Sequence, residues 1–133
     1  MLEIRRQIKD KYDISNLYKK MAWFDYLKLN EDQLYQSMEN SYSVVYVYDE
    51  SDLVASGRVV SDGVINAYIC GVCVLEPYRK HGIGSSIVKE LIKDCENKSL
   101  HIQLVCEDHL KSYYEKLGFN DFAIAMKYNS SSI

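Results

Sequence analysis

Residues 72–87 constrain the fold of this chain more than any other segment. An apolar strand runs into Arg79-Lys80-His81-Gly82-Ile83-Gly84, and an amphipathic helix follows at once. The two glycines let the backbone approach a ligand closely, while the start of the helix offers unpaired N–H groups and the positive end of its dipole. This corner therefore predicts a site for an anion such as a phosphate or pyrophosphate. The alternative is an ordinary glycine-containing turn before a helix.

Length and composition predict one domain over residues 1–133. The chain is 47% apolar and holds no internal repeat or low-complexity linker. Its net charge of −3, with both signs interspersed, argues against nucleic acid or an anionic membrane as a partner. The first six residues lack the apolar core of a signal peptide, and the longest apolar stretch, residues 64–75, is too short to span a bilayer. We expect a cytoplasmic protein with reduced cysteines.

Cys70 and Cys73 form a Cys-x-x-Cys pattern, which can indicate zinc or redox chemistry. On a regular strand, however, residues three apart point to opposite faces, and no second pair of ligands follows. We predict buried, inert cysteines and no metal site.

The first half of the chain predicts two helices and three strands. Asp13 is placed to cap the first helix, and Asn30 with Gln33 suggests a capping box on the second. Strands are predicted over residues 43–48, 53–60 and 64–75, with a hairpin turn at Asp62-Gly63. Because the third of these strands is apolar almost throughout, we place it at the centre of the sheet, covered on both sides.

The second half predicts a helix over residues 82–96, a strand over 101–106, a helix from Asp108 that ends at Gly118, and a final strand or strand pair over 119–128. The full order is β-α-α-β-β-β-α-β-α-β. This order describes an α/β domain in which about four helices flank a mixed sheet.

Two motifs together indicate a family. Arg79, Gly82 and Gly84 fit the pattern Gln/Arg-x-x-Gly-x-Gly/Ala, and residues 113–119 read Tyr-Tyr-Glu-Lys-Leu-Gly-Phe. The chain resembles the GNAT superfamily of N-acetyltransferases, in which the first pattern binds acetyl-coenzyme A (acetyl-CoA) and the second lies on a late helix. Residues 22–23, 40–41 and 57–63 resemble a bacterial subgroup of small, single-domain members. The resemblance implies the GNAT fold.

The resemblance also implies how the cofactor is held. Backbone groups of Val72, Cys73 and Val74 would pair with the pantetheine arm like an added strand. The loop residues Arg79, Lys80, His81, Gly82, Ile83, Gly84 and Ser85 would hold the pyrophosphate, with the N–H groups of residues 80–85 as donors. Gly71 suits the strand distortion that leaves room for the thioester, although members of the subgroup often carry an acidic residue near that point.

Acetyl transfer to an amine needs an acid for the leaving thiolate and a route for the amine proton. The resemblance favours Tyr114 as general acid, since an unperturbed phenol with a pKa near ~10 stays protonated at neutral pH. Without the resemblance, the residues themselves favour the interpretation that Tyr113 and Tyr114 are core aromatics of an apolar helix face. Glu107 is a candidate base, at a position where relatives often have an Asn that contacts the cofactor. Glu76 and His101 are secondary candidates, and a bound water is the alternative to all three.

Acceptor recognition is expected from Trp23, Tyr26 and Tyr35, opposite the cofactor, although Trp23 suits a core anchor equally well. The sequence has no conspicuous acidic groove for a basic peptide, so we expect a small-molecule amine. Family members often pair through edge strands or helices, which predicts a homodimer. The alternative function is a non-catalytic CoA-binding regulatory module. A nucleotide-binding P-loop is disfavoured because no Gly-Lys-Ser/Thr follows.

Overall fold

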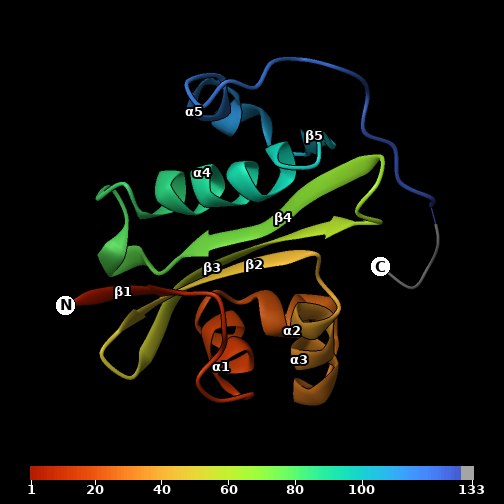
Figure 1. Ribbon diagram of the computed structural model, residues 1–133. Helices are drawn as coiled ribbons and strands as arrows, with labels where there is room; N and C mark the ends of the chain where they lie inside the picture. The colour runs from red at the N-terminus through yellow and green to blue at the C-terminus, as the bar shows by residue number, and fades with distance from the viewer. Residues whose placement is uncertain (130–133) are drawn as a thin grey trace.

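The computed structural model describes residues 1–129, which form a five-stranded sheet in the order β1-β2-β3-β4-β5. Helices α1, α2 and α3 lie on one face of the sheet, and α4 and α5 lie on the other (Figure 1). The elements are β1 (Leu2–Arg5), α1 (Asp13–Lys20), α2 (Trp23–Leu27), α3 (Glu31–Glu39), β2 (Ser43–Asp49), β3 (Asp52–Ser61), β4 (Asn66–Val74), η1 (Glu76–Tyr78), α4 (Ile83–Glu96), β5 (His101–Leu104), η2 (Asp108–Leu110) and α5 (Lys111–Glu115).

The sheet is mixed, as predicted. Strands β1 to β4 pair antiparallel in sequence order, whereas β4 and β5 pair parallel. The parallel pair needs a crossover, and α4 supplies it across one face. The fold class inferred from the sequence is confirmed. None of the helices in the described part of the chain has the length and hydrophobicity to cross a bilayer.

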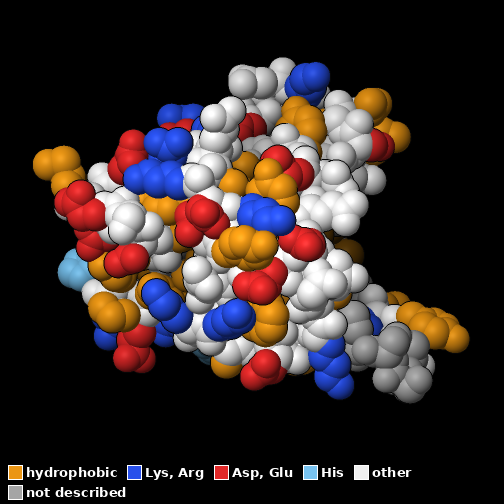
Figure 2. Space-filling model, turned by 90° about the horizontal axis from the view of Figure 1, so that it is seen from below, with side chains coloured by type: hydrophobic (Ala, Val, Ile, Leu, Met, Phe, Trp, Pro, Cys, Tyr) orange, Lys and Arg blue, Asp and Glu red, His pale blue; other side chains and the backbone are white. Residues whose placement is uncertain are grey.

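Two hydrophobic layers hold the helices to the sheet. On one side, α4 presents a buried stripe made by Ile83, Ile87, Val88, Leu91 and Cys95. On the other side, Ile14, Leu17 and Tyr18 of α1 pack with Leu34 and Met38 of α3 over the sheet. The outer surface of this helical side carries acidic and basic side chains interspersed (Figure 2).

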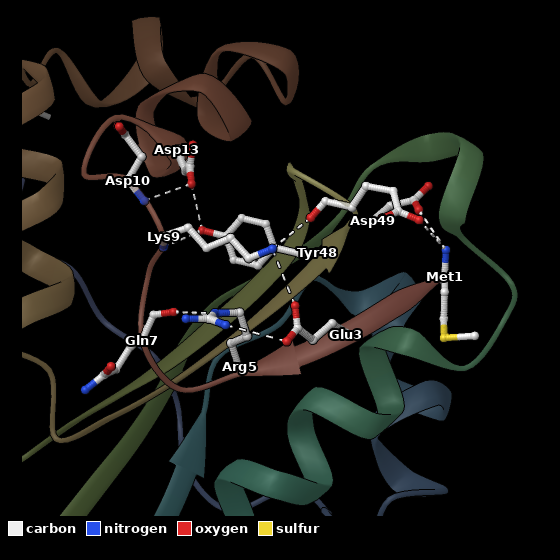
Figure 3. A network of polar contacts seen from close by, with 10 residues as sticks. Met1, Glu3, Arg5, Gln7, Lys9, Asp10, Asp13, Tyr48 and Asp49 are labelled. Atoms are coloured by element: carbon white, nitrogen blue, oxygen red, sulfur yellow. Dashed lines mark hydrogen bonds and ion pairs between the residues drawn. The ribbon is translucent and has the colours of Figure 1, made fainter.

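Asp13 begins α1 but does not cap it. Its Oδ2 accepts a hydrogen bond from the Tyr48 hydroxyl at 2.7 Å and another from the backbone N–H of Asp10 at 3.2 Å. The backbone N–H of Lys9 in turn donates to the Tyr48 hydroxyl at 3.0 Å (Figure 3). The predicted cap is therefore wrong, because a buried phenol on β2 has taken that carboxylate as its partner.

The segment between α1 and α3 holds a short helix that the sequence pattern did not predict. Ala22 adopts a left-handed φ of 63°, which ends the first helix and lets α2 begin at Trp23. The capping box at Asn30 is confirmed: its side chain accepts from the Gln33 N–H at 2.8 Å, and the Gln33 side chain accepts from the Asn30 N–H at 2.9 Å.

Strand β4 is not the centre of the sheet. That position belongs to β3, which is buried over most of its length, whereas residues along β4 alternate between buried and more exposed. The apolar run over residues 64–75 suggested burial on both faces, but its first two apolar residues, Val64 and Ile65, lie in the exposed turn. The Asp62-Gly63 turn itself is confirmed: Asp62 Oδ1 accepts hydrogen bonds from the N–H groups of Val64 and Ile65.

The predicted final strand over residues 119–128 is absent: within the described residues no strand follows β5. Phe122, Ile124, Met126 and Tyr128 alternate as a strand requires, yet they are 68–90% exposed. A cleft of about 510 Å³ separates residues 118–125 from β5. Alternation specifies which side chains share a face, but it does not supply a pairing partner. The preceding helix, α5, is also shorter than predicted.

Candidate active site

Strands β4 and β5 diverge about halfway along β4. Their pairing ends at Ile69 and Leu104, while β4 continues to Val74. Beyond Ile69, β4 therefore has a backbone edge that β5 does not cover. The N–H of Leu75 bonds to the Val54 carbonyl on β3 at 2.9 Å, so by alternation the backbone groups of Val72 and Val74 point the other way, toward the open edge.

A bulge lies where the strands diverge. Ser56 pairs with Cys73 and Arg58 pairs with Cys70, so three steps on β4 match two on β3. Gly71 occupies the bulge with a φ of +66°, a conformation that a side chain disfavours. The distortion expected at Gly71 is thus present in the structure.

The same bulge corrects the prediction for the two cysteines. Because Ser56 and Arg58 share a face of β3, their partners Cys73 and Cys70 share a face of β4 rather than pointing to opposite sides. Both are free thiols. Burial raises the pKa of Cys73 to about 12 and also raises that of Cys70, which keeps both thiols protonated at neutral pH.

The glycine loop between β4 and α4 offers a row of donors. Lys80 and Gly82 both adopt left-handed backbone conformations, with φ of 67° and 80°. The hydrogen bonds formed within residues 1–129 include none donated by the backbone N–H groups of residues 80–85; the first helical bond of α4 runs from Ser86 to the Gly82 carbonyl. Arg79 braces the loop, because its Nε donates to the Val74 carbonyl at 2.8 Å.

A groove of about 500 Å³ joins the open edge of β4 to this loop. It brings together all the predicted cofactor residues except the exposed His81. It also includes Tyr114, the predicted general acid, and five residues for which the sequence predicted no cofactor contact. The lining is Met21, Val72, Cys73, Val74, Tyr78, Arg79, Lys80, Gly82, Ile83, Gly84, Ser85, His109, Leu110, Tyr113 and Tyr114. Of those five residues, only Tyr113 belongs to a motif that could have indicated its place.

Tyr113 and Tyr114 occupy different parts of the groove wall. The Tyr113 hydroxyl lies 3.1 Å from Ser85 Oγ, at the start of α4. Tyr114 packs edge-to-face on Tyr113 and on Phe119, with ring centroids 5.0 and 6.0 Å away. Burial, with smaller contributions from Tyr113 and Cys106, raises the pKa of Tyr114 above its ordinary value of 10.0. Its hydroxyl proton is therefore retained throughout the neutral range.

Glu107 lies outside this lining. It precedes η2, its side chain is 83% exposed, and its Oε2 is 3.8 Å from Nδ1 of His109. Of the three aromatic residues expected to meet the acceptor, none lines the groove. Trp23 packs edge-to-face on Tyr18 at 5.2 Å, Tyr26 is 66% exposed, and Tyr35 donates to Glu39 at 2.7 Å on α3.

Solved structures share this architecture. The GNAT family protein SP0256 of Streptococcus pneumoniae superposes with a TM-score of 0.78 at 23% identity, covering 98% of this chain and 99% of that one. An acetyltransferase from Clostridium acetobutylicum, solved with acetyl-CoA, gives a TM-score of 0.72 at 18% identity, covering 97% and 96%. These likenesses establish the fold.

Sequence comparison supplies the family. Protein YyaT of Bacillus subtilis is 30% identical over 86 residues, which are 64% of this chain and 57% of that protein. The chain thus spans little more than half the length of this relative. Residues 8–119 match the family model described as acetyltransferase (GNAT) family. The chain therefore belongs to the GNAT family of acetyltransferases.

Proposed function

We propose that this protein is an N-acetyltransferase that moves the acetyl group of acetyl-CoA to a primary amine of a small molecule, by direct attack in a ternary complex. The observation that carries the proposal is the row of free N–H donors at residues 80–85, set at the end of a groove that follows the open edge of β4. Such donors at a helix start suit a pyrophosphate, and an open strand edge suits a peptide-like arm.

The residues present fit this ligand. Val72 offers both its N–H and its carbonyl to the groove, whereas the Val74 carbonyl is already taken by Arg79. A pantetheine arm that starts at the loop and pairs with the Val74 N–H and the Val72 carbonyl would bring its thioester toward the bulge at Gly71. The thioester supplies an acetyl group already activated for attack by an amine.

Two groups of the chain act on the reacting atoms. The N–H of Val72 donates to the carbonyl oxygen as negative charge develops on it, and one such donor is worth roughly 3–4 kcal/mol where water is excluded. The Tyr114 hydroxyl gives its proton to the sulfur as the C–S bond breaks and the N–C bond forms. The Val72 N–H is the available donor, because alternation turns the Cys73 N–H toward β3 and the Val74 N–H pairs with the pantetheine arm in this proposal.

The amine proton leaves to water in this proposal. Glu107, the candidate base from the sequence, lies exposed beside His109 and outside the groove lining, which favours the alternative of a bound water. The acceptor approaches from the side of α1 and α2, since Met21 at the end of α1 forms that wall of the groove.

An amine panel assayed for release of free CoA thiol tests the proposal. We expect thiol release above the rate of spontaneous hydrolysis with at least one small amine, and calorimetric binding of acetyl-CoA. Gly84→Val should weaken that binding about tenfold or more, because a side chain there meets the Tyr113 hydroxyl, 3.0 Å from an added Cβ. Ser86→Val, exposed in the same helical turn, is the matched control and should bind normally.

Two results would contradict the proposal in different ways. Tight acetyl-CoA binding without thiol release across the panel would identify a non-catalytic CoA-binding module. Absence of binding heat would remove both functions.

A further inference from the structure

In the part of the chain that the structure describes, Arg58 on β3 is a partly buried cation without an anionic partner. Among residues 1–129, no carboxylate lies within 4 Å of its guanidinium, and its one side-chain hydrogen bond runs from Nη1 to Ser41 Oγ at 3.3 Å. Arg6 provides the contrast, since it pairs with Glu90 at 3.2 Å and Asp94 at 2.6 Å although it is more exposed to solvent. Burying a guanidinium without an opposite charge is unfavourable, so its retention points to a ligand.

The position of Arg58 places that ligand beside the open edge of β4. Arg58 pairs with Cys70, directly before the bulge, and an added Cβ at Gly71 would lie 3.9 Å from both its Cγ and its Nε. The same Cβ would lie 3.3 Å from the Tyr18 hydroxyl. Arg58 therefore reaches the point where β4 and β5 diverge, from the face covered by α1.

Electrostatics around the bulge agree with this position. Burial raises the pKa of Tyr18, Tyr68 and Cys70, and Arg58 opposes that rise for all three. These neighbours are neutral at physiological pH, so they leave the positive charge uncompensated. Tyr18 and Tyr68 can instead add hydroxyl hydrogen bonds to a ligand.

We propose that Arg58 binds a carboxylate or phosphate group on the acceptor, and that the acceptor is consequently an amine that also carries an anionic group. This inference rests on the proposed function, because it takes the divergence of β4 and β5 as the place of acetyl transfer. A guanidinium binds either anion through two parallel N–H donors. The positive charge also disfavours a second positive charge nearby, which helps the bound amine to remain neutral for attack.

Calorimetry on the CoA-loaded protein tests the proposal without requiring turnover. The probes are matched pairs that differ in the anion: phosphoethanolamine against ethanolamine, and β-alanine against its amide. We expect at least one anionic member to bind roughly 10- to 100-fold more tightly than its partner, the range that charge-assisted hydrogen bonds supply. Arg58→Gln should abolish the preference, and Arg58→Lys should keep part of it. Arg5→Gln, at a half-buried arginine on β1 that is paired with Glu3, should leave it intact.

Substitution at Gly71 gives a second measurement. Gly71→Asp places a carboxylate in front of Arg58 and should remove the preference, whereas Gly71→Asn has the same shape without the charge and should retain it. Both residues tolerate a left-handed φ better than most, and melting curves identify any variant that does not fold.

Equal binding within each pair, binding of no anionic member, or a preference that survives in Arg58→Gln would each overturn the assignment of Arg58. Thiol release from amines without an anionic group would then leave the acetyltransferase function standing. Conversely, an Arg58-dependent anion preference without thiol release would support the binding site and contradict the proposed reaction.

Discussion

Tyr114 combines two properties that suit a general acid: it lines the groove, and its surroundings hold its proton firmly. Burial raises its pKa, so the protonated form persists to a higher pH than in a free phenol. Replacing Tyr114 with Phe removes the hydroxyl while keeping the ring that packs on Tyr113 and Phe119. We expect kcat to fall about 100-fold or more, with the affinity for acetyl-CoA nearly unchanged. Steady-state kinetics and calorimetry measure the two effects.

Tyr113→Phe is the matched control. It loses the contact with Ser85 at the loop, so we expect a higher KM for acetyl-CoA with kcat retained. The pH profile adds a further readout: where Tyr114 is the acid, activity declines only above pH ~10, and Tyr114→Phe lacks that limb. Wild-type turnover in Tyr114→Phe would remove this residue from the mechanism.

At the scale of single elements, α3 depends on its capping box. Asn30→Ala removes the side-chain acceptor for the Gln33 N–H and frees the Gln33 side chain from its reciprocal bond. The free energy of unfolding should fall by about 1 kcal/mol. Asn40→Ala at the other end of α3 should change it little, because the cap there is formed by backbone bonds. Chemical denaturation measures the free energy of unfolding of both variants. Equal decreases in that free energy would show that the capping box does not stabilise α3 specifically.

The contact between β3 and α4 is a second element-scale constraint. A Cβ added at Gly57 would lie 2.6 Å from Cγ2 of Ile87, closer than side chains can approach. Gly57→Ala should therefore push α4 from the sheet and lower the free energy of unfolding by about 1–3 kcal/mol. Ser112→Ala on exposed α5 provides a control that should melt like the wild type. An unchanged melting temperature for Gly57→Ala would contradict the close packing of this layer.

For the whole molecule, buried phenols and a buried thiol predict sensitivity to alkali. Burial raises the pKa of Cys73 and Tyr46 to about 12 and also raises those of Tyr18 and Tyr48. The unfolded chain therefore loses these protons first as the pH rises. Their stabilising contribution is complete below pH ~9 and is lost above it, at up to about 1.4 kcal/mol per group and pH unit.

Melting temperatures followed by circular dichroism should accordingly be constant from pH 7 to about 8.5 and fall steeply between pH ~9 and ~11. Cys73→Ala should soften the first part of that decline, since the thiol has the lowest unfolded pKa of the set. A melting temperature that holds at pH ~11 would show that these groups are not buried as described.

What the sequence determined by itself was local. The strand–loop–helix corner, the Asn30 capping box and the Asp62-Gly63 turn each depend on residues close together in the chain, and all three are present in the structure. The hydrophobic and turn patterns also predicted the order of most elements and a mixed sheet, although not which pair of strands is parallel. The candidate site residues within the corner also lie close together in the structure, because one short segment positions them.

Which distant groups meet depends on the three-dimensional fold. Asp13 bonds to Tyr48 of β2 instead of capping its own helix, and the bulge at Gly71 turns Cys70 and Cys73 to one face. Residues 119–128 carry a strand pattern but find no neighbouring strand in the described chain. That Arg58 has no carboxylate partner among the described residues likewise follows only from the folded structure. Such outcomes depend on partners far away in sequence, whose hydrogen bonds, charges and packing override local preference.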